Sequence, residues 1–241
     1  MAKVNNHSAN GKQKRLQKLL DSICLRFEEL KSDSNGSATL LQKIAVMDTD
    51  QMAFAENSSE KVDCETVLRN AISQARDPSV AEVLQNLNAC LKDLTWKEDN
   101  FEFYPKGSDL GKRYRESNLH AQIIGPHGDL FQTDEFMLGF FHLGPWTLYK
   151  DHSHAALELY LNLSDGSEWR FNFGAWSKFD AGSLVCNPSK QIHATSVFET
   201  PFLSVFAWLS DINCLCEVCE SDDHDQIEGH LLKSSLETKP A

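Results

Sequence analysis

The first part of the chain carries apolar residues at the three- and four-residue spacing of amphipathic helices. Leucine, isoleucine and phenylalanine recur in this way between residues 12 and 31 and predict a helix, which the polar run 32–37 ends. Asp77-Pro78 supplies a cap and a first-turn proline ahead of a second periodic run that ends near Leu94. Residues 39–75 are expected to add one or two helices, with a loop at 57–60. The pattern predicts a helical N-terminal extension over residues 1–95.

From Phe101 onward the pattern changes to short aromatic and β-branched runs between glycine, proline, aspartate and asparagine turns. We expect strands at 136–141, 146–149, 157–163, 168–173, 183–186, 194–198 and 203–209. Seven or more short strands are typical of a β-sandwich or a jelly-roll barrel. Residues 96–212 are therefore predicted to form a mainly β domain.

The strand at 157–163 alternates strictly between leucine and polar residues. One face carries only leucine: Leu157, Leu159, Leu161 and Leu163. The other face carries Glu158, Tyr160 and Asn162. The leucine face must be covered by helices of the same chain or by a second subunit, so a homodimer is one expectation. A polar face that is also buried indicates a lined cavity.

Glu158 follows two histidines, His152 and His154, and His193 lies downstream. Three imidazoles and one carboxylate can fill four positions around a divalent transition metal and still leave room for a substrate. We predict these four residues as ligands of one such ion, for which zinc, iron and manganese are all suitable. The remaining histidines of this region are interpreted as hydrogen-bonded core residues: His120, His127 and His142.

The surroundings of these ligands resemble the two motifs of the cupin superfamily. The first motif is matched by Gly144, His152, His154, Glu158 and Gly166, and the second by Gly182, Pro188 and His193. Lys190 stands where the second motif usually has glycine, and Val197 where it usually has asparagine. The resemblance implies a cupin-type jelly-roll β-barrel behind the α-helical N-terminal extension.

Within the cupins, the block 144–166 with the segments 188–193 and 201–211 resembles the dimethylsulfoniopropionate (DMSP) lyases. The similarity covers roughly residues 95 to 212, and Glu158-Leu-Tyr160 is its most specific part. The resemblance implies a carbon–sulfur lyase of the dimethylpropiothetin dethiomethylase type. Such an enzyme splits DMSP, a small zwitterionic sulfonium, into dimethyl sulfide and acrylate by β-elimination. It also implies catalytic roles for Tyr160 and Tyr149.

Tyr160 is the expected base. A free tyrosine has a pKa of about 10, but Tyr160 lies one strand repeat beyond Glu158, where metal contact would lower that value. On an unbroken strand, the side chains of Tyr149 and His154 would point to opposite faces. Tyr149 faces the site only if the chain bends around Lys150-Asp151, and we expect it to position the substrate or to act as a second base.

The sulfonium end of the implied substrate is a cation without hydrogen-bond donors, which aromatic faces hold best. Trp146 and Trp176 lie near the motifs and are expected to line the substrate pocket. The other aromatic residues of the strands are interpreted as barrel core.

Two other functional classes stay open. A cupin dioxygenase of a thiol or small organic acid would use the same ligands to bind iron and activate oxygen, and it would not need Tyr160. A non-catalytic cupin binding or sensor protein would bind its ligand without turnover, and Tyr160→Phe would leave its affinity nearly intact.

Composition narrows the partners and the compartment. A net charge of −12 argues against nucleic-acid binding, although the first twenty residues hold five basic residues and no acid, a basic and flexible start. No apolar run is long enough to span a bilayer and no apolar signal core follows Met1, so we expect no membrane partner and a cytoplasmic location. Seven scattered cysteines fit a reducing compartment.

The last segment, residues 213–241, is rich in acidic residues and is interpreted as a solvated tail. It holds the cluster Cys214-x-Cys216-x-x-Cys219, which is a candidate for a soft metal or redox site. The cluster lacks a second ligand pair with zinc-finger spacing. Incidental thiols on a solvent-facing tail are therefore the favoured interpretation.

Overall fold

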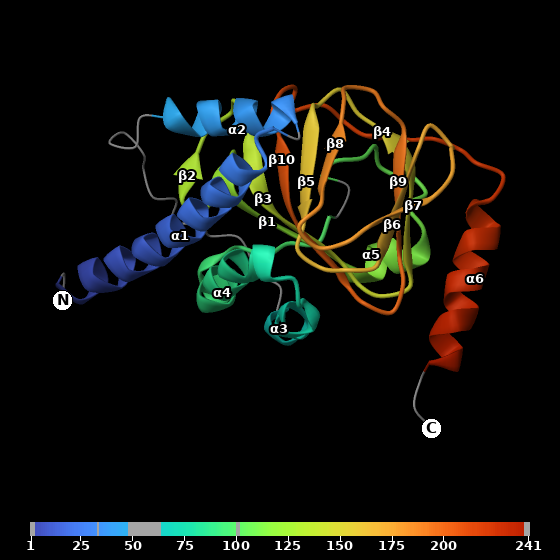
Figure 1. The fold of residues 1–241 in the computed structure, drawn as a ribbon, viewed down its shortest axis with the longest axis horizontal. Helices are drawn as coiled ribbons and strands as arrows, with labels where there is room; N and C mark the ends of the chain where they lie inside the picture. Colours follow the sequence, from blue (N-terminus) through green and yellow to red (C-terminus); the bar gives the residue numbers. More distant parts are fainter. Residues whose placement is uncertain (1–2, 33, 48–63, 100–101, 239–241) are drawn as a thin grey trace.

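The computed structural model describes residues 3–32, 34–47, 64–99 and 102–238. Most of its helices come first in the chain and its strands follow (Figure 1). The α-helices are α1 (Lys3–Glu29), α2 (Asn35–Ala45), α3 (Glu65–Gln74), α4 (Ala81–Cys90), α5 (Lys112–Ser117) and α6 (His224–Glu237). Two short 3-10 helices, η2 (Pro78–Val80) and η3 (Leu91–Asp93), flank α4.

The predicted N-terminal helices form at the expected places. α1 contains the predicted run 12–31 apart from its last two residues, and α2 and α3 supply the helices expected within 39–75. The Asp77 carboxylate accepts a hydrogen bond from the backbone N–H of Ser79, so the predicted cap is present. The single helix predicted up to Leu94 is divided into η2, α4 and η3. The predicted loop at 57–60 lies outside the described residues.

Two sheets form the β structure, one of six strands and one of five. The six-stranded sheet runs in the order β2 (Phe131–Gln132), β1 (Asn118–Gly125), β3 (Met137–Leu143), β10 (Phe202–Trp208), β5 (Glu158–Asn162) and β8 (Leu184–Asn187). The five-stranded sheet runs in the order β11 (Glu217–Val218), β4 (Thr147–Ser153), β9 (His193–Val197), β6 (Ser167–Phe171) and β7 (Ser177–Phe179). Neighbouring strands are antiparallel, except for the parallel pair β1 and β2.

All seven predicted strands are present, although β4 continues to Ser153, past its predicted end at residue 149. The sequence pattern does not predict β1, β2, β7 or β11. The last three have only two or three residues each. In β1 the polar His120 and Gln122 are fully buried, so burial there does not follow hydrophobicity.

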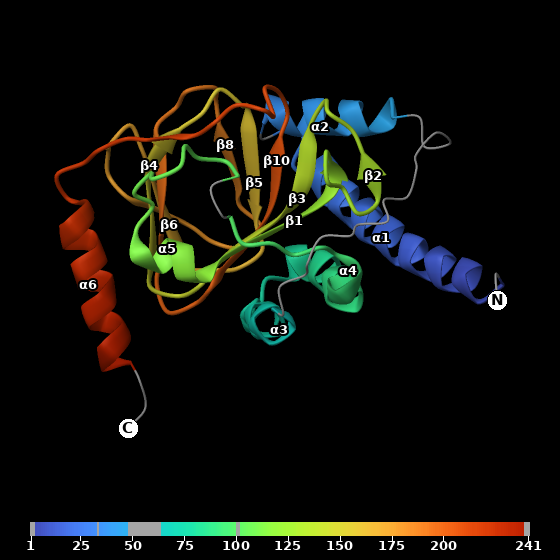
Figure 2. The same ribbon diagram turned by 180° about the vertical axis from the view of Figure 1, so that it is seen from behind.

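The N-terminal helices cover the outer face of the six-stranded sheet (Figures 1 and 2). Leu159, Leu161 and Leu163 of the leucine face have no exposed surface and belong to one core with the apolar residues of α1 to α4. The contact with α2 is close, because a Cβ on Gly36 would lie 2.6 Å from a methyl carbon of Leu159. Helices of the same chain therefore cover this face, which removes the argument for a second subunit.

The inner face of the six-stranded sheet packs against the five-stranded sheet around a second, largely aromatic core. Strand residues whose side chains point into the space between the two sheets supply it, including Tyr160, Trp169, Phe202 and Trp208. Glu158 also lies on this side and is buried. The interior of the barrel is therefore where the predicted ligands meet aromatic side chains.

The C-terminal segment is not the solvated tail that its composition predicts. β11 pairs with β4, and α6 lies against β4 at the side of the barrel remote from α1 (Figure 1). Cys216 is only 2% exposed, and His224 and Leu231 are buried. Composition was misleading because basic side chains of the barrel match the acidic residues, as Arg170 does for Asp223.

Within the described residues, none of the helices combines the length and apolar character that crossing a membrane requires.

Candidate metal centre and active-site cavity

Three of the predicted ligands converge at one end of the five-stranded sheet. His152 and His193 face each other as register partners on β4 and β9, with ring centroids 4.1 Å apart. His154 follows directly after β4, and one ligand atom from each of the three imidazoles lies within 4.8 Å of the other two. All three side chains are buried. This separation suits donors around a single metal ion.

The hydrogen bonds of the three rings fix which nitrogen faces the centre. Each Nδ1 lies close to a main-chain carbonyl oxygen, those of Lys150 (2.8 Å), Ala156 (3.1 Å) and Gln191 (2.9 Å). A carbonyl oxygen can only accept, so each Nδ1 must donate, which leaves each Nε2 of a neutral ring with a free lone pair. The buried Nε2 of His193 has no hydrogen-bond partner within the described residues. This tautomer is the one that metal-binding histidines use.

Glu158 completes the set from the neighbouring sheet. Its Oε2 lies 3.2 Å from the Nε2 atoms of both His154 and His193. The carboxylate also accepts hydrogen bonds from Asn187 Nδ2 (2.8 Å) and Trp208 Nε1 (2.7 Å), which orient it. With no proton or cation between them, the lone pairs of these two imidazoles and the carboxylate would point at one region and repel each other. The donor set fits a cation at their centre.

Burial and neighbouring charges shift the pKa values of three of these residues. Burial lowers the pKa of His152 well below its ordinary value, and the neighbouring imidazoles lower it further. Burial favours the neutral form of Glu158, but His154 and His193 hold its pKa well below the ordinary value. Burial also lowers the pKa of His154, yet the Glu158 carboxylate raises it above its usual range. A cation at the centre would compete with a proton for the Nε2 atom of His154.

The bend that Tyr149 requires is present. The register of β4 against β9 shifts between Tyr149 and His152, as in a β-bulge. The Tyr149 ring stacks on the His152 ring with centroids 4.1 Å apart, and its hydroxyl lies 2.6 Å from that of Tyr104. The bulge thus places Tyr149 beside the ligand set.

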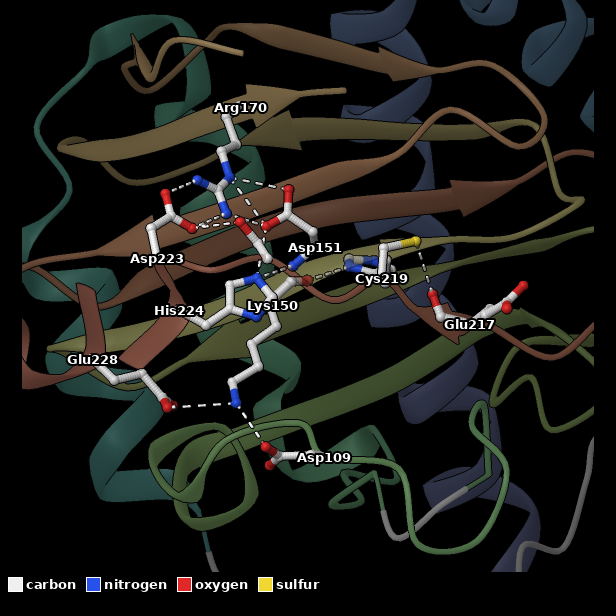
Figure 3. Close-up of polar contacts among 11 residues, drawn as sticks. Asp109, Lys150, Asp151, Arg170, Glu217, Cys219, Asp223, His224 and Glu228 are labelled. Carbon is white, nitrogen blue, oxygen red and sulfur yellow. Dashed lines mark hydrogen bonds and ion pairs between the residues drawn. The ribbon is translucent and has the colours of Figure 1, made fainter. Parts of the chain in front are cut away.

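Lys150 and Asp151, the two residues at this bulge, belong to a cluster of polar contacts (Figure 3). The buried Asp151 carboxylate accepts hydrogen bonds from Arg170 Nε (3.0 Å) and lies 2.8 Å from His224 Nε2. Arg170 also donates to Asp223 (2.9 Å), at the start of α6. The Lys150 ammonium lies 2.8 Å from Asp109 and 3.5 Å from Glu228. The C-terminal segment therefore anchors the stretch of β4 that carries His152.

One cavity reaches two of the four predicted ligands, His154 and Glu158. Its titratable lining consists of Asp99, Tyr114, His120, Tyr149, His154, Glu158, Tyr160 and Cys216. Its apolar aromatic lining consists of Phe103, Phe141, Phe206 and Trp208. Tyr160 and Tyr149 both lie here, as predicted for residues of one site. Burial raises the pKa of Tyr160 well above its ordinary value, and the Glu158 charge raises it further.

The structure does not bring the two predicted tryptophans into this cavity. Trp146 lies in the turn before β4 with a positive φ of 61°, which takes it out of the strand alternation. Trp176 stacks over Arg170, whose guanidinium carbon lies 4.9 Å from the ring centroid, and it lines a separate hollow beside α6. Aromatic lining is instead supplied by residues such as Phe103 and Trp208.

The interpretation of the other three histidines as core residues is correct only in part. His120 is buried, lies 3.5 Å from Glu102 and lines the cavity. The side chain of His127 is 55% exposed. His142 is buried, but neither ring nitrogen has a hydrogen bond of good geometry within the described residues.

Sequence reasoning also missed a group of cavity residues: Asp99, Phe103, Tyr114 and Cys216. They precede the first strand or follow the last predicted one, in segments without strand periodicity. Their role at the site depends on how the chain ends wrap the barrel, which no local pattern indicates.

Comparison with known proteins gives a consistent result. The family model described as dimethylsulfoniopropionate lyase matches residues 13–204. A putative DMSP lyase, DddL of Cereibacter sphaeroides, is 33% identical over 122 residues, 48% of this chain and 45% of that protein. The DMSP lyase DddQ of Ruegeria pomeroyi is 26% identical over 107 residues, 44% of this chain and 53% of that protein. The chain thus spans about half the length of the curated relatives it matches.

Solved structures show the same fold. The crystal structure of DddQ from Ruegeria pomeroyi matches with a TM-score of 0.64 and 18% identity, over 85% of this chain and 96% of that one. A chain from the crystal structures of the DMSP lyases RdDddP and RnDddQII matches with a TM-score of 0.66 and 16% identity, over 87% of this chain and 100% of that one. The predicted fold class, a mainly β cupin-type barrel with a helical N-terminal extension, is confirmed. Because the family model covers most of the chain, this protein belongs to the dimethylsulfoniopropionate lyase family.

Proposed function

We propose that this protein is a carbon–sulfur lyase that cleaves DMSP into dimethyl sulfide and acrylate. The observation that carries the proposal is the convergence of three buried imidazoles and one carboxylate beside a cavity that contains a tyrosine. Membership of the DMSP lyase family supports the choice of reaction. His152, His154, Glu158 and His193 would hold one divalent transition metal ion, with zinc, iron and manganese as candidates.

Tyr160 is the proposed base. Its phenolate would take the α-proton of the substrate, the released electron pair would form the Cα–Cβ double bond, and the C–S bond would break. The sulfur leaves with the bonding pair as dimethyl sulfide, and acrylate remains. Burial and the Glu158 charge oppose formation of this phenolate. A bound metal ion would supply the balancing positive charge and would withdraw electron density from the substrate carboxylate.

The other cavity residues would position the substrate. Tyr149 is held between His152 and the Tyr104 hydroxyl, and we assign it substrate positioning, with proton abstraction as its alternative role. Phe103 and Trp208, which pack edge to face with ring centroids 5.5 Å apart, line the cavity with aromatic surface that is suited to a sulfonium group. These rings also displace water from the reacting carbons.

The test is a product assay on protein reconstituted separately with zinc, iron and manganese. We expect dimethyl sulfide in the headspace and acrylate in solution in equal amounts, because one elimination yields one of each. Equal amounts with no oxygen uptake would support elimination over a dioxygenase reaction. No product with any of these metals would refute the lyase assignment, and tight binding of DMSP without product would favour a binding protein.

A further inference from the structure

Asp99 is a buried carboxylate in the wall of the cavity. The residue lies two positions after Lys97, which forms an isolated β-bridge with His120, and it is 6% exposed. One carboxylate oxygen accepts the backbone N–H of Glu102, and the other accepts the hydroxyl of Tyr114, each at 3.0 Å. Both donors are uncharged.

This carboxylate differs from the comparably buried acidic residues of the described chain. Asp129 pairs with Lys12 at 3.2 Å, Asp151 pairs with Arg170, and Glu158 lies 3.2 Å from His154. Within the described residues, no basic side chain lies within ion-pair distance of Asp99. Two neutral hydrogen bonds offset only part of the cost of burying a charge. A cation in the adjoining cavity would offset more of it.

Stacked rings connect Asp99 to the metal-ligand set. Tyr149 stacks on His152, and Tyr114 stacks on Tyr149 with centroids 4.7 Å apart. The Tyr114 hydroxyl then donates to Asp99. The cavity therefore has a metal-binding wall and, two aromatic rings away, an anionic wall.

We propose that Asp99 is the counter-ion for the cationic end of a zwitterionic substrate whose carboxylate occupies the metal-binding wall. The ligand class is a short carboxylate with an onium group, either sulfonium or quaternary ammonium. The aromatic faces of Phe103 and Tyr114 exclude water around that group, and the Asp99 charge selects cations over neutral groups of the same shape. The choice of DMSP as the natural member of this class rests on the proposed function.

The test compares two ligands of equal shape on zinc-loaded protein by isothermal titration calorimetry. The ligands are the zwitterion 3-(trimethylammonio)propionate and its carbon isostere 4,4-dimethylpentanoate, which has the same carboxylate and a neutral tert-butyl group in place of the ammonium. We expect the wild type to prefer the ligand with the ammonium group by about tenfold or more. Asp99→Asn should remove most of this preference while leaving the affinity for 4,4-dimethylpentanoate within about twofold, because asparagine keeps the shape and can still bond to the Tyr114 hydroxyl.

Glu102→Gln is the matched control. It removes the neighbouring carboxylate, which lies outside the cavity lining, and should keep the preference. An unchanged preference in Asp99→Asn, or a wild type that binds the two ligands equally or not at all, would overturn the inference. Zinc content and the thermal unfolding midpoint establish that the variant is folded and loaded.

The outcomes separate this inference from the proposed function. Loss of the preference in Asp99→Asn, with no dimethyl sulfide from DMSP in the wild type, would retain the cation subsite and reject the lyase. Release of dimethyl sulfide by the wild type, with an unchanged ligand preference in Asp99→Asn, would support the lyase and reject the cation subsite. If both hold, Asp99→Asn should raise the KM for DMSP about tenfold or more with a smaller change in kcat.

Discussion

Arg170→Met should destabilise the protein strongly, because it removes the guanidinium from the buried Asp151 carboxylate and leaves His224 as its remaining side-chain partner. The side chains of Arg170 and Asp151 are 3% and 0% exposed, and the substitution removes the guanidinium while keeping much of the apolar volume. Removing one partner of a buried ion pair costs about 3–5 kcal/mol. That is a large share of the roughly 5–15 kcal/mol by which domains are stable. Asp223→Asn should cost about 1 kcal/mol or less, because the Asp223 side chain is 43% exposed.

The assay is urea unfolding of metal-free protein, followed by tryptophan fluorescence. Trp176 reports directly, since its ring lies under the Arg170 guanidinium. A double variant, Arg170→Met with Asp151→Leu, tests the cause: with both charges replaced by apolar groups, most of the loss should be recovered. A cost below about 1 kcal/mol for Arg170→Met, or a double variant no more stable than the single one, would refute the uncompensated-charge argument.

Three further predictions follow from individual side chains. Tyr160→Phe should abolish dimethyl sulfide release while zinc content stays at the wild-type level; retained activity would move the base to Tyr149. Burial lowers the pKa of His142 to about 4, so the unfolded chain takes up this proton first as the pH falls. Stability should therefore decrease below pH ~6.5, by about 2 kcal/mol at pH 5, and His142→Leu should remove this component in urea titrations at pH 7 and pH 5. Leu159→Ala, at a fully buried position under α2, should cost about 3 kcal/mol in the same unfolding assay, and a cost under about 1 kcal/mol would contradict close helix packing.

The elements with local patterns were predictable from the sequence. The periodic runs gave the helices, and strict alternation at 157–163 placed Glu158 and Tyr160 on the inner side of β5 and the leucines under the helices. The metal-ligand set was also local, apart from His193, which the second motif supplied. From the sequence, a bend at Lys150-Asp151 could be named only as the condition under which Tyr149 faces the site. Whether a bulge forms there depends on the pairing with the partner strand β9.

The long-range parts of the site were not predictable. The acidic C-terminal segment packs on the barrel because Arg170 and Lys150 lie opposite its charges, and these pairs are 53 and 78 positions apart in the chain. Trp146 and Trp176 were assigned to the pocket from their closeness in sequence to the motifs. A positive φ takes Trp146 out of the strand alternation, and the guanidinium of Arg170 holds Trp176 outside the cavity. Asp99 precedes every strand and carried no recognisable pattern.

The central claim is that catalysis requires one metal ion at His152, His154, Glu158 and His193. The most direct measurement is the rate of dimethyl sulfide release from DMSP as chelator-stripped protein is titrated with zinc, iron or manganese, with His193→Ala as the matched variant. We predict no release without metal, a rise that saturates near one equivalent per chain with at least one of the metals, and no such rise in His193→Ala. Equal rates in the metal-free and metal-loaded wild type would contradict the claim.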